Sequence, residues 1–209
     1  SDQPPLIRVR GAFLTIAIAE YFRDKGNDVL LLMDSLTRFS MAQREIGLAI
    51  GEPPTSKGYT PSVFSLLTKL LERAGNGEGD GTMTGIYTVL VEGDDLDDPI
   101  ADSARSILDG HVVLSRKLAD GNHYPPVDVL RSISRTMKDI VPKEQIEYAS
   151  RIIEVLSEFE RAEDLINIGA YTPGSNKKID YAISMIDKVK VFLTQSIDEQ
   201  TTIEETFNS

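Results

Sequence analysis

The sequence predicts an α/β fold with a mainly parallel sheet and flanking helices, followed by a small all-α domain. Two observations lead to this prediction: short apolar runs alternate with helical patterns as far as Val141-Pro142, and only helical patterns follow. Alternating strands and helices are typical of βαβ units, in which crossover helices join parallel strands. We therefore predict one domain over residues 1–141 and a helical domain over residues 142–209.

The first predicted elements are a helix, a strand and a second helix. Apolar residues recur at helical spacing over residues 6–25, and a glycine suited to a helix C-terminus follows. Residues 29–33 form a continuous apolar run that ends at Asp34, which is the pattern of a strand buried on both faces of a parallel sheet. The second helix is expected over residues 36–49, because a Gly-Glu-Pro-Pro break follows it.

Thr60-Pro61 marks the start of the next helix, with Thr60 as the N-cap and Pro61 at the first helical position. This helix is expected to end near Arg73, before a glycine-rich loop. The remaining expected elements are a strand at 85–91, a helix at 100–108, a strand at 111–114, and helices around 146–159 and 179–192.

Composition and charge exclude several classes of protein. The formal net charge is −11, which argues against a general nucleic-acid groove, because such a groove needs clustered Lys and Arg. Any anionic ligand must therefore be held by local charges or backbone N–H groups. No apolar stretch approaches the ~18 residues that span a bilayer, and the first residues do not have the pattern of a signal peptide. The absence of cysteine fits a reducing cytosol.

Asp34 is the first candidate site residue. A carboxylate at the carboxyl end of a buried parallel strand lies where ligands bind in open α/β sheets. It is placed to hold Mg²⁺, directly or through water, while the metal bridges nucleotide phosphates. On these residues alone the stronger alternative is that Asp34 only caps the next helix.

Longer strings add a family resemblance. The strings are RVRGAFLTIAIAEYFRDKG, DVLLLMDSLTRFSMAQREIGLAIGEPPTSKGYTPSVFSLLTKLLERAG, YTVLVEGDDLDDPIADSARSILDGHVVLSR and HYPPVDVLRSISR. Together they resemble the flagellar and type III secretion ATPases, relatives of the rotary ATP synthase subunits. The resemblance implies that residues 1–141 are the C-terminal part of a RecA-like P-loop NTPase domain. The opening SDQPPLIRVRGAF favours the flagellar branch over the injectisome branch.

The resemblance implies catalytic roles for three residues. Asp34 matches the Walker B carboxylate on the Mg²⁺ side of the site. Arg38 would support the phosphates, although a salt bridge to a neighbouring carboxylate is an equal alternative. Arg135 matches the arginine finger that reaches the nucleotide of the neighbouring subunit, where such a residue typically contributes about 10³–10⁵ in rate. Its alternative is a structural arginine.

The resemblance also implies an adenine pocket for ATP. Tyr124 matches the tyrosine that stacks on the base, and the alternative is a tyrosine of the core. Ala170 and Tyr171 are expected to supply a second wall. Stacking suits this role because an aromatic face binds a base with little dependence on hydrogen bonds.

The phosphate-binding motif Gly-x-x-x-x-Gly-Lys-[Ser/Thr] does not occur in the sequence. In the family this loop, a catalytic glutamate and an N-terminal β-barrel would lie upstream of the first residue. The phosphate-loop strand would lie between the later strands, so we expect exposed apolar strand edges. The expectation is that the chain is a fragment, inactive by itself.

The implied function is Mg²⁺-dependent ATP hydrolysis by a cytoplasmic homohexamer at the flagellar base, peripheral to the inner membrane. Hydrolysis would release export substrates from chaperones and deliver them to the export gate. Residues 51–58 and 94–98 match segments that face a central stalk protein. One alternative is an interaction module that binds chaperone–substrate complexes or the stalk. Another alternative is the injectisome ATPase. A third is a rotary synthase subunit, but the string GLAIGEPPTSKGYTPSVF fits that subunit poorly.

Overall fold

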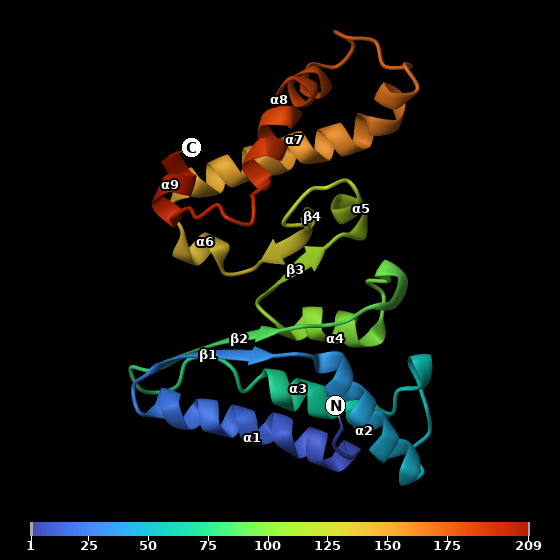
Figure 1. Cartoon of the computed structure of the whole chain (residues 1–209), viewed down its shortest axis with the longest axis vertical. Coiled ribbons are helices and arrows are strands. Elements are labelled where there is room, and N and C mark those ends of the chain that lie inside the picture. The colour runs from blue at the N-terminus through green and yellow to red at the C-terminus, as the bar shows by residue number, and fades with distance from the viewer. Residues whose placement is uncertain (1, 209) are drawn as a thin grey trace. The chain divides into compact units, whose positions relative to one another are not determined.

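The structure, a computed structural model, describes residues 2–208. Ser1 and Ser209, which begin and end the two predicted domains, lie outside the described residues. The chain divides into two compact units, Ser1–Leu108 and Asp109–Ser209 (Figure 1). Among the described residues, no helix is both long enough and apolar enough to cross a membrane.

The first unit alternates helices and strands as expected. Its elements are α1 (Pro5–Asp24), β1 (Asp28–Met33), α2 (Leu36–Ala49), η1 (Ser56–Gly58), α3 (Pro61–Leu71), β2 (Thr82–Tyr87), η2 (Glu92–Asp94) and α4 (Pro99–Ile107). The predicted helix at 36–49 coincides with α2, whereas the predicted strand at 85–91 overlaps β2 only over residues 85–87. The α/β class of the fold is thus confirmed.

The two strands of this unit pair in parallel. Their register runs from Asp28 opposite Thr82 to Met33 opposite Tyr87. β1 and β2 hydrogen-bond to each other directly, so the expected missing strand does not lie between these two. Its place among the later strands stays a prediction. Each strand keeps one unpaired edge within this two-stranded sheet.

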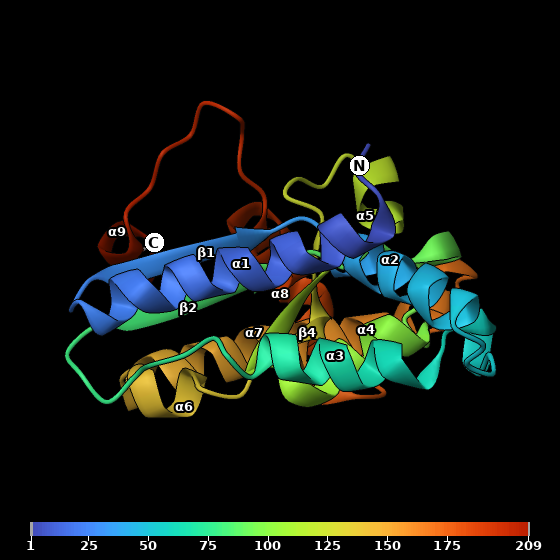
Figure 2. The same cartoon turned by 90° about the horizontal axis from the view of Figure 1, so that it is seen from below.

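One face of β1 packs against the helices. Leu31 is 5% exposed, and α1 runs along the strand in both views (Figures 1 and 2). The other face is open: Leu30 is 61% and Leu32 is 65% exposed. Burial on both faces, which the apolar run predicts, is thus absent from this chain. The core on the covered side contains Val9, Ile16, Leu31, Leu36, Phe39, Ala42, Tyr59, Val63, Leu67, Leu70, Leu71, Ile100 and Ala104.

Side-chain hydroxyls at the two helix starts behave differently. Ser35 is the N-cap of α2, and its Oγ accepts a hydrogen bond from the Arg38 backbone N–H at 3.3 Å. Thr60 is the N-cap residue of α3 and Pro61 is its first residue, as predicted, but the Thr60 side chain makes no capping bond. It is buried against α2, where a Cβ at Gly47 would lie 2.3 Å from the Thr60 Oγ1. Glycine at 47 therefore permits the close approach of the two helices.

The second unit combines a hairpin with helices. It contains β3 (Gly110–Leu114), α5 (Arg116–Asp120), β4 (Val127–Ser134), α6 (Met137–Ile140), α7 (Lys143–Asn167), α8 (Lys177–Leu193) and α9 (Ile203–Asn208). The expected strand at 111–114 is present, but it pairs antiparallel with β4 instead of joining the parallel sheet. No sequence pattern predicted β4, whose apolar residues are interrupted by polar ones.

The helices α7 and α8 form a hairpin with its own small core around Val155, Ala182 and Val189. The compact units divide at residues 108/109. Because β4 contacts α7, the β3–β4 hairpin belongs to the same unit as the C-terminal helices. The domain boundary at 141/142 stays a prediction.

An ion pair joins α1 to the end of α3 and gives a pH-dependent test. The Arg73 Nε donates to Glu20 Oε1 at 2.7 Å, and this hydrogen bond is the main reason that the pKa of Glu20 lies below its ordinary value of 4.5. We expect Glu20→Gln to lower the free energy of unfolding by about 1 kcal/mol at pH 7, measured by urea denaturation.

The stabilisation is present above the unfolded-state pKa of Glu20 and is lost as the pH falls through the lower folded-state pKa. The difference between wild type and Glu20→Gln should therefore shrink below about pH 4. Glu72→Gln, which changes an exposed glutamate, is the control. A pH-independent difference would contradict the prediction.

Candidate functional site

A cleft lies at the carboxyl end of β1, between α1 and the start of α2. Its volume is about 320 Å³. The lining residues are Arg8, Ala12, Thr15, Leu32, Met33, Asp34, Ser35, Arg38 and Phe39. β1 ends at Met33 and α2 begins at Leu36, so the cleft lies at the carboxyl end of the strand. Open α/β folds bind ligands at this end of the sheet.

Asp34 presents an exposed carboxylate to this cleft. Its Oδ1 accepts a hydrogen bond from the Thr88 Oγ1 at 2.7 Å, the only hydrogen bond to this carboxylate within residues 2–208. The N-terminus of α2 is capped by Ser35 and not by Asp34. The helix-cap alternative for Asp34 is therefore wrong, and its second oxygen stays available for a ligand.

Arg38 lies in the first turn of α2 and lines the same cleft. Its guanidinium is exposed and has no hydrogen bond or ion pair to the described residues, so the salt-bridge alternative is not realised. Arg8 of α1 adds a second guanidinium, which no sequence pattern singled out. Its Nη2 donates to Glu45 Oε1 at 2.9 Å, while its Nε is buried without a partner among residues 2–208.

Two guanidinium groups and one carboxylate suit a metal-bound oxyanion. Guanidinium groups bind phosphate or carboxylate oxygens through charge-assisted hydrogen bonds. The described residues contain no group of three or more potential metal ligands. A single carboxylate is nevertheless enough for Mg²⁺, which keeps several waters and takes its remaining ligands from substrate phosphates. The donor set therefore fits a magnesium–nucleotide ligand.

Tyr124 and Arg135 lie in the second unit. Tyr124 is 51% exposed, so it is not the core tyrosine of the alternative interpretation. Its carbonyl accepts a hydrogen bond from the Gln195 N–H at 2.8 Å. Arg135 follows β4 directly, is exposed, and donates its backbone N–H to the Asp109 carbonyl at 2.8 Å.

Tyr171 lies at the turn between α7 and α8. Its hydroxyl donates to Asp180 Oδ1 at 2.9 Å near the start of α8, whereas Gln195 follows the end of that helix. A helix of 17 residues is roughly 25 Å long, and so the structure does not bring Ala170 and Tyr171 to Tyr124. The segment that it does bring there begins at Gln195, for which no sequence pattern gave a signal.

The two loops expected to face a stalk protein contact each other. The Lys57 Nζ lies 2.6 Å from Asp95 Oδ2 and 3.4 Å from Asp98 Oδ2. The hydrogen bond to Asp95 is the main reason that the pKa of Lys57 is raised, and the same bond lowers the pKa of Asp95. Asp98 also caps α4. Residues 51–58 and 92–98 therefore form one linked loop pair.

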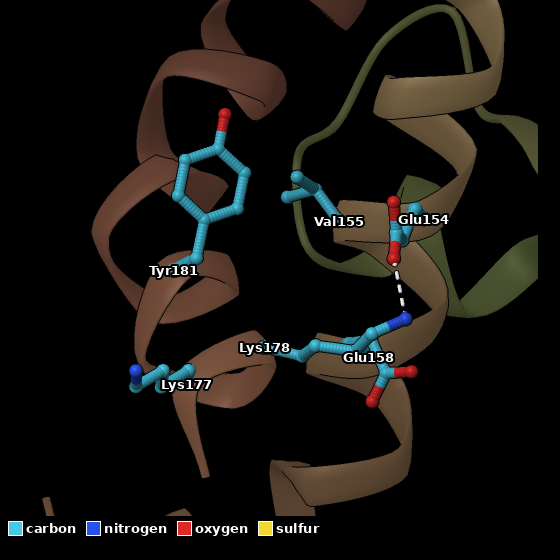
Figure 3. A pocket seen from close by; sticks show the side chains of 6 residues that line it. All are labelled: Glu154, Val155, Glu158, Lys177, Lys178 and Tyr181. Carbon is cyan, nitrogen blue, oxygen red and sulfur yellow. Dashed lines mark hydrogen bonds and ion pairs between the residues drawn. The ribbon is translucent and has the colours of Figure 1, made fainter. Parts of the chain in front are cut away.

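A second pocket of about 210 Å³ lies between α7 and α8 (Figure 3). Glu154, Val155 and Glu158 line it from α7, and Lys177, Lys178 and Tyr181 line it from α8. Lys178 reaches across to Glu154 at 2.8 Å, whereas Lys177 points away from α7 (Figure 3). The pocket combines an exposed aromatic ring with charges of both signs.

Comparison with known families identifies the family of the chain. Residues 1–134 match the ATP synthase alpha/beta family, nucleotide-binding domain. The chain belongs to this family. Residues 141–209 match the T3SS EscN ATPase C-terminal domain, so the family member carries the C-terminal domain of the secretion ATPases.

Curated relatives cover this ATP synthase alpha/beta family member from end to end. The chain is 56% identical over 98% of its length to the flagellum-specific ATP synthase of Bacillus subtilis and 52% identical over 100% to that of Salmonella typhimurium. It is 51% identical over 99% to the type 3 secretion system ATPase of Xanthomonas euvesicatoria. The chain spans about half the length of these relatives, 46–47%.

Solved structures agree with this assignment. The assembled ATPase EscN of the enteropathogenic E. coli type III secretion system matches 100% of the chain with a TM-score of 0.94 at 47% identity, and the match covers 50% of that chain. EscN in complex with its central stalk EscO matches 99% of the chain with a TM-score of 0.87 at 45% identity, covering 49% of that chain. The fold is therefore the C-terminal part of a RecA-like ATPase followed by a helical domain.

The linked loop pair gives a local test. Lys57→Met removes the cation that joins the loops, and we expect hydrogen exchange of backbone amides in residues 92–98 to rise about twofold or more in the mutant. Lys69→Met, which changes an exposed lysine of α3, should leave that exchange unchanged. Equal exchange in wild type and Lys57→Met would show that the ion pair does not hold the acidic turn.

Proposed function

We propose that the chain is part of a longer ATPase that energises flagellar type III protein export. The observation that carries this proposal is the cleft at the end of β1, which both Asp34 and Arg38 line, in a member of an ATPase family. The names of the Bacillus and Salmonella relatives favour the flagellar system over the injectisome. We place the protein in the cytoplasm, peripheral to the inner membrane.

Each site residue has a role in this proposal. Asp34 holds a Mg²⁺ ion through its second oxygen, and Arg38 contacts the phosphates from the α2 side of the cleft. A metal ion held by Asp34 would neutralise charge on the phosphates of ATP. Tyr124 stacks on adenine, and the segment beginning at Gln195, in place of Ala170 and Tyr171, is the nearer candidate for the second wall.

Arg135 acts on a neighbouring subunit in this proposal. Its exposed position after β4 leaves the side chain at the surface, where an arginine finger must be. One of the similar EscN structures is an assembled ATPase, and another is a complex with the central stalk EscO. We infer a homohexamer whose linked loop pair contacts a stalk protein. Hydrolysis of ATP by this homohexamer releases export substrates from their chaperones at the export gate.

The 209-residue chain by itself is not expected to hydrolyse ATP. Its sequence contains no phosphate-binding loop of the Gly-x-x-x-x-Gly-Lys-[Ser/Thr] type, whose N–H groups cradle the phosphates. A second candidate function for the chain alone is an interaction module. The pocket between α7 and α8, with Tyr181 exposed on its wall, favours binding of a chaperone–substrate complex there.

Complementation between inactive variants tests the shared site. In the longer protein we expect Asp34→Ala to abolish ATP hydrolysis, and Arg135→Ala to lower it by about 10³-fold or more while nucleotide affinity changes little. Mixing the two inactive variants should restore part of the activity, because some sites then combine an intact Asp34 with an intact Arg135 from the neighbour.

Arg131→Ala, which changes an exposed arginine on β4 close to Arg135, is the matched control and should keep its activity. No recovery on mixing, together with full activity of Arg135→Ala, would refute the arginine finger. Hydrolysis by the 209-residue chain alone that disappears with Asp34→Ala would refute the need for the upstream loop.

A further inference from the structure

Thr88, just after β2, makes three hydrogen bonds to Asp34 and the residues near it. Its backbone N–H donates to the Met33 carbonyl at 3.1 Å, and its carbonyl accepts from the Leu36 N–H at 2.9 Å. Its hydroxyl donates to Asp34 Oδ1 at 2.7 Å. The backbone of Thr88 is thus held by residues on both sides of Asp34. Such a backbone cannot shift without breaking at least one of these bonds.

The strand register explains why the hydroxyl meets this carboxylate. Because Asp28 lies opposite Thr82 and Met33 opposite Tyr87, continuing the parallel register places Thr88 opposite Asp34. The same pairing occurs at the other end of the strands, where the Thr82 Oγ1 donates to Asp28 Oδ1 at 2.8 Å. Of these two pairs, only the one at the carboxyl end opens onto the cleft.

We propose that Thr88 is a positioning residue for Asp34, an inference that rests on the proposed nucleotide site. An exposed aspartate at a strand end can adopt several side-chain rotamers. The Thr88 hydroxyl selects one of them by holding Oδ1, and Oδ2 would then be the oxygen that holds the hydrated Mg²⁺ of the nucleotide. The Met33 carbonyl, at 3.5 Å, is the weaker acceptor for this hydroxyl.

A purely structural role is the competing explanation, because the Thr82–Asp28 bond closes the strands in the same way at the end away from the cleft. The chain therefore offers a matched control. Thr88→Val and Thr82→Val each remove one hydroxyl that donates to an aspartate on the neighbouring strand. Thr88→Ser restores the hydroxyl at the site.

The first measurement is the Mg²⁺ dependence of ADP binding to the longer protein. We expect Thr88→Val to raise the Mg²⁺ concentration for half-maximal binding about tenfold, because hydrogen bonds to charged groups are among the stronger ones. Binding in EDTA should be unchanged. Thr82→Val should stay near wild type, and Thr88→Ser should recover most of the loss. Equal effects of Thr88→Val and Thr82→Val would overturn the positioning role.

The second measurement needs no nucleotide. In the 209-residue chain labelled with ¹³C-aspartate, the Asp34 carboxyl signal is identified by its loss in Asp34→Asn. Thr88→Val should shift this signal, whereas Thr82→Val should shift the Asp28 signal instead. An unmoved Asp34 signal would overturn the proposal. If the signal moves but wild-type binding is independent of Mg²⁺, the proposed nucleotide site fails and Thr88 has no metal to position.

Discussion

The parallel register of β1 and β2 is the constraint on which the cleft depends. It places the ends of both strands at one edge of the sheet, so that Asp34 and Thr88 face each other across the pair. The start of α2 is tied to the same point through the Leu36 N–H, which donates to the Thr88 carbonyl. A shift of one residue would turn the side chains of one strand to the opposite face and separate the carboxylate from its partner.

Local charge, and not the total, decides what this edge can bind. The chain carries a formal net charge of −11, yet the cleft has Arg8 and Arg38 on its walls and only Asp34 as a lining acid among the described residues. Many of the acidic side chains lie elsewhere, as in residues 92–98, where Lys57 compensates two of them. An anionic nucleotide can therefore be attracted at short range by a protein that repels anions at long range.

The sequence predicted those features that depend on neighbouring residues. The helix at 36–49 and the position of Asp34 at a strand end follow from local apolar patterns, and both are present. Features set by distant contacts could not be predicted in this way. The pairing of β3 with β4, the burial of Thr60 against Gly47, and Arg8 in the cleft each depend on packing between separate segments. The family resemblance implies an adenine-pocket role for Tyr171, whereas its hydrogen bond to Asp180 holds it in the α7–α8 turn.

The open face of β1 offers a position for a probe that detects contact with another polypeptide. Leu30 is 61% exposed and belongs neither to the helical core nor to the cleft lining. A small environment-sensitive fluorophore attached at this position, through a cysteine that the chain otherwise lacks, would sit in water without disturbing either region. Its emission would then register the moment when another polypeptide covers the strand, whether during assembly or during aggregation.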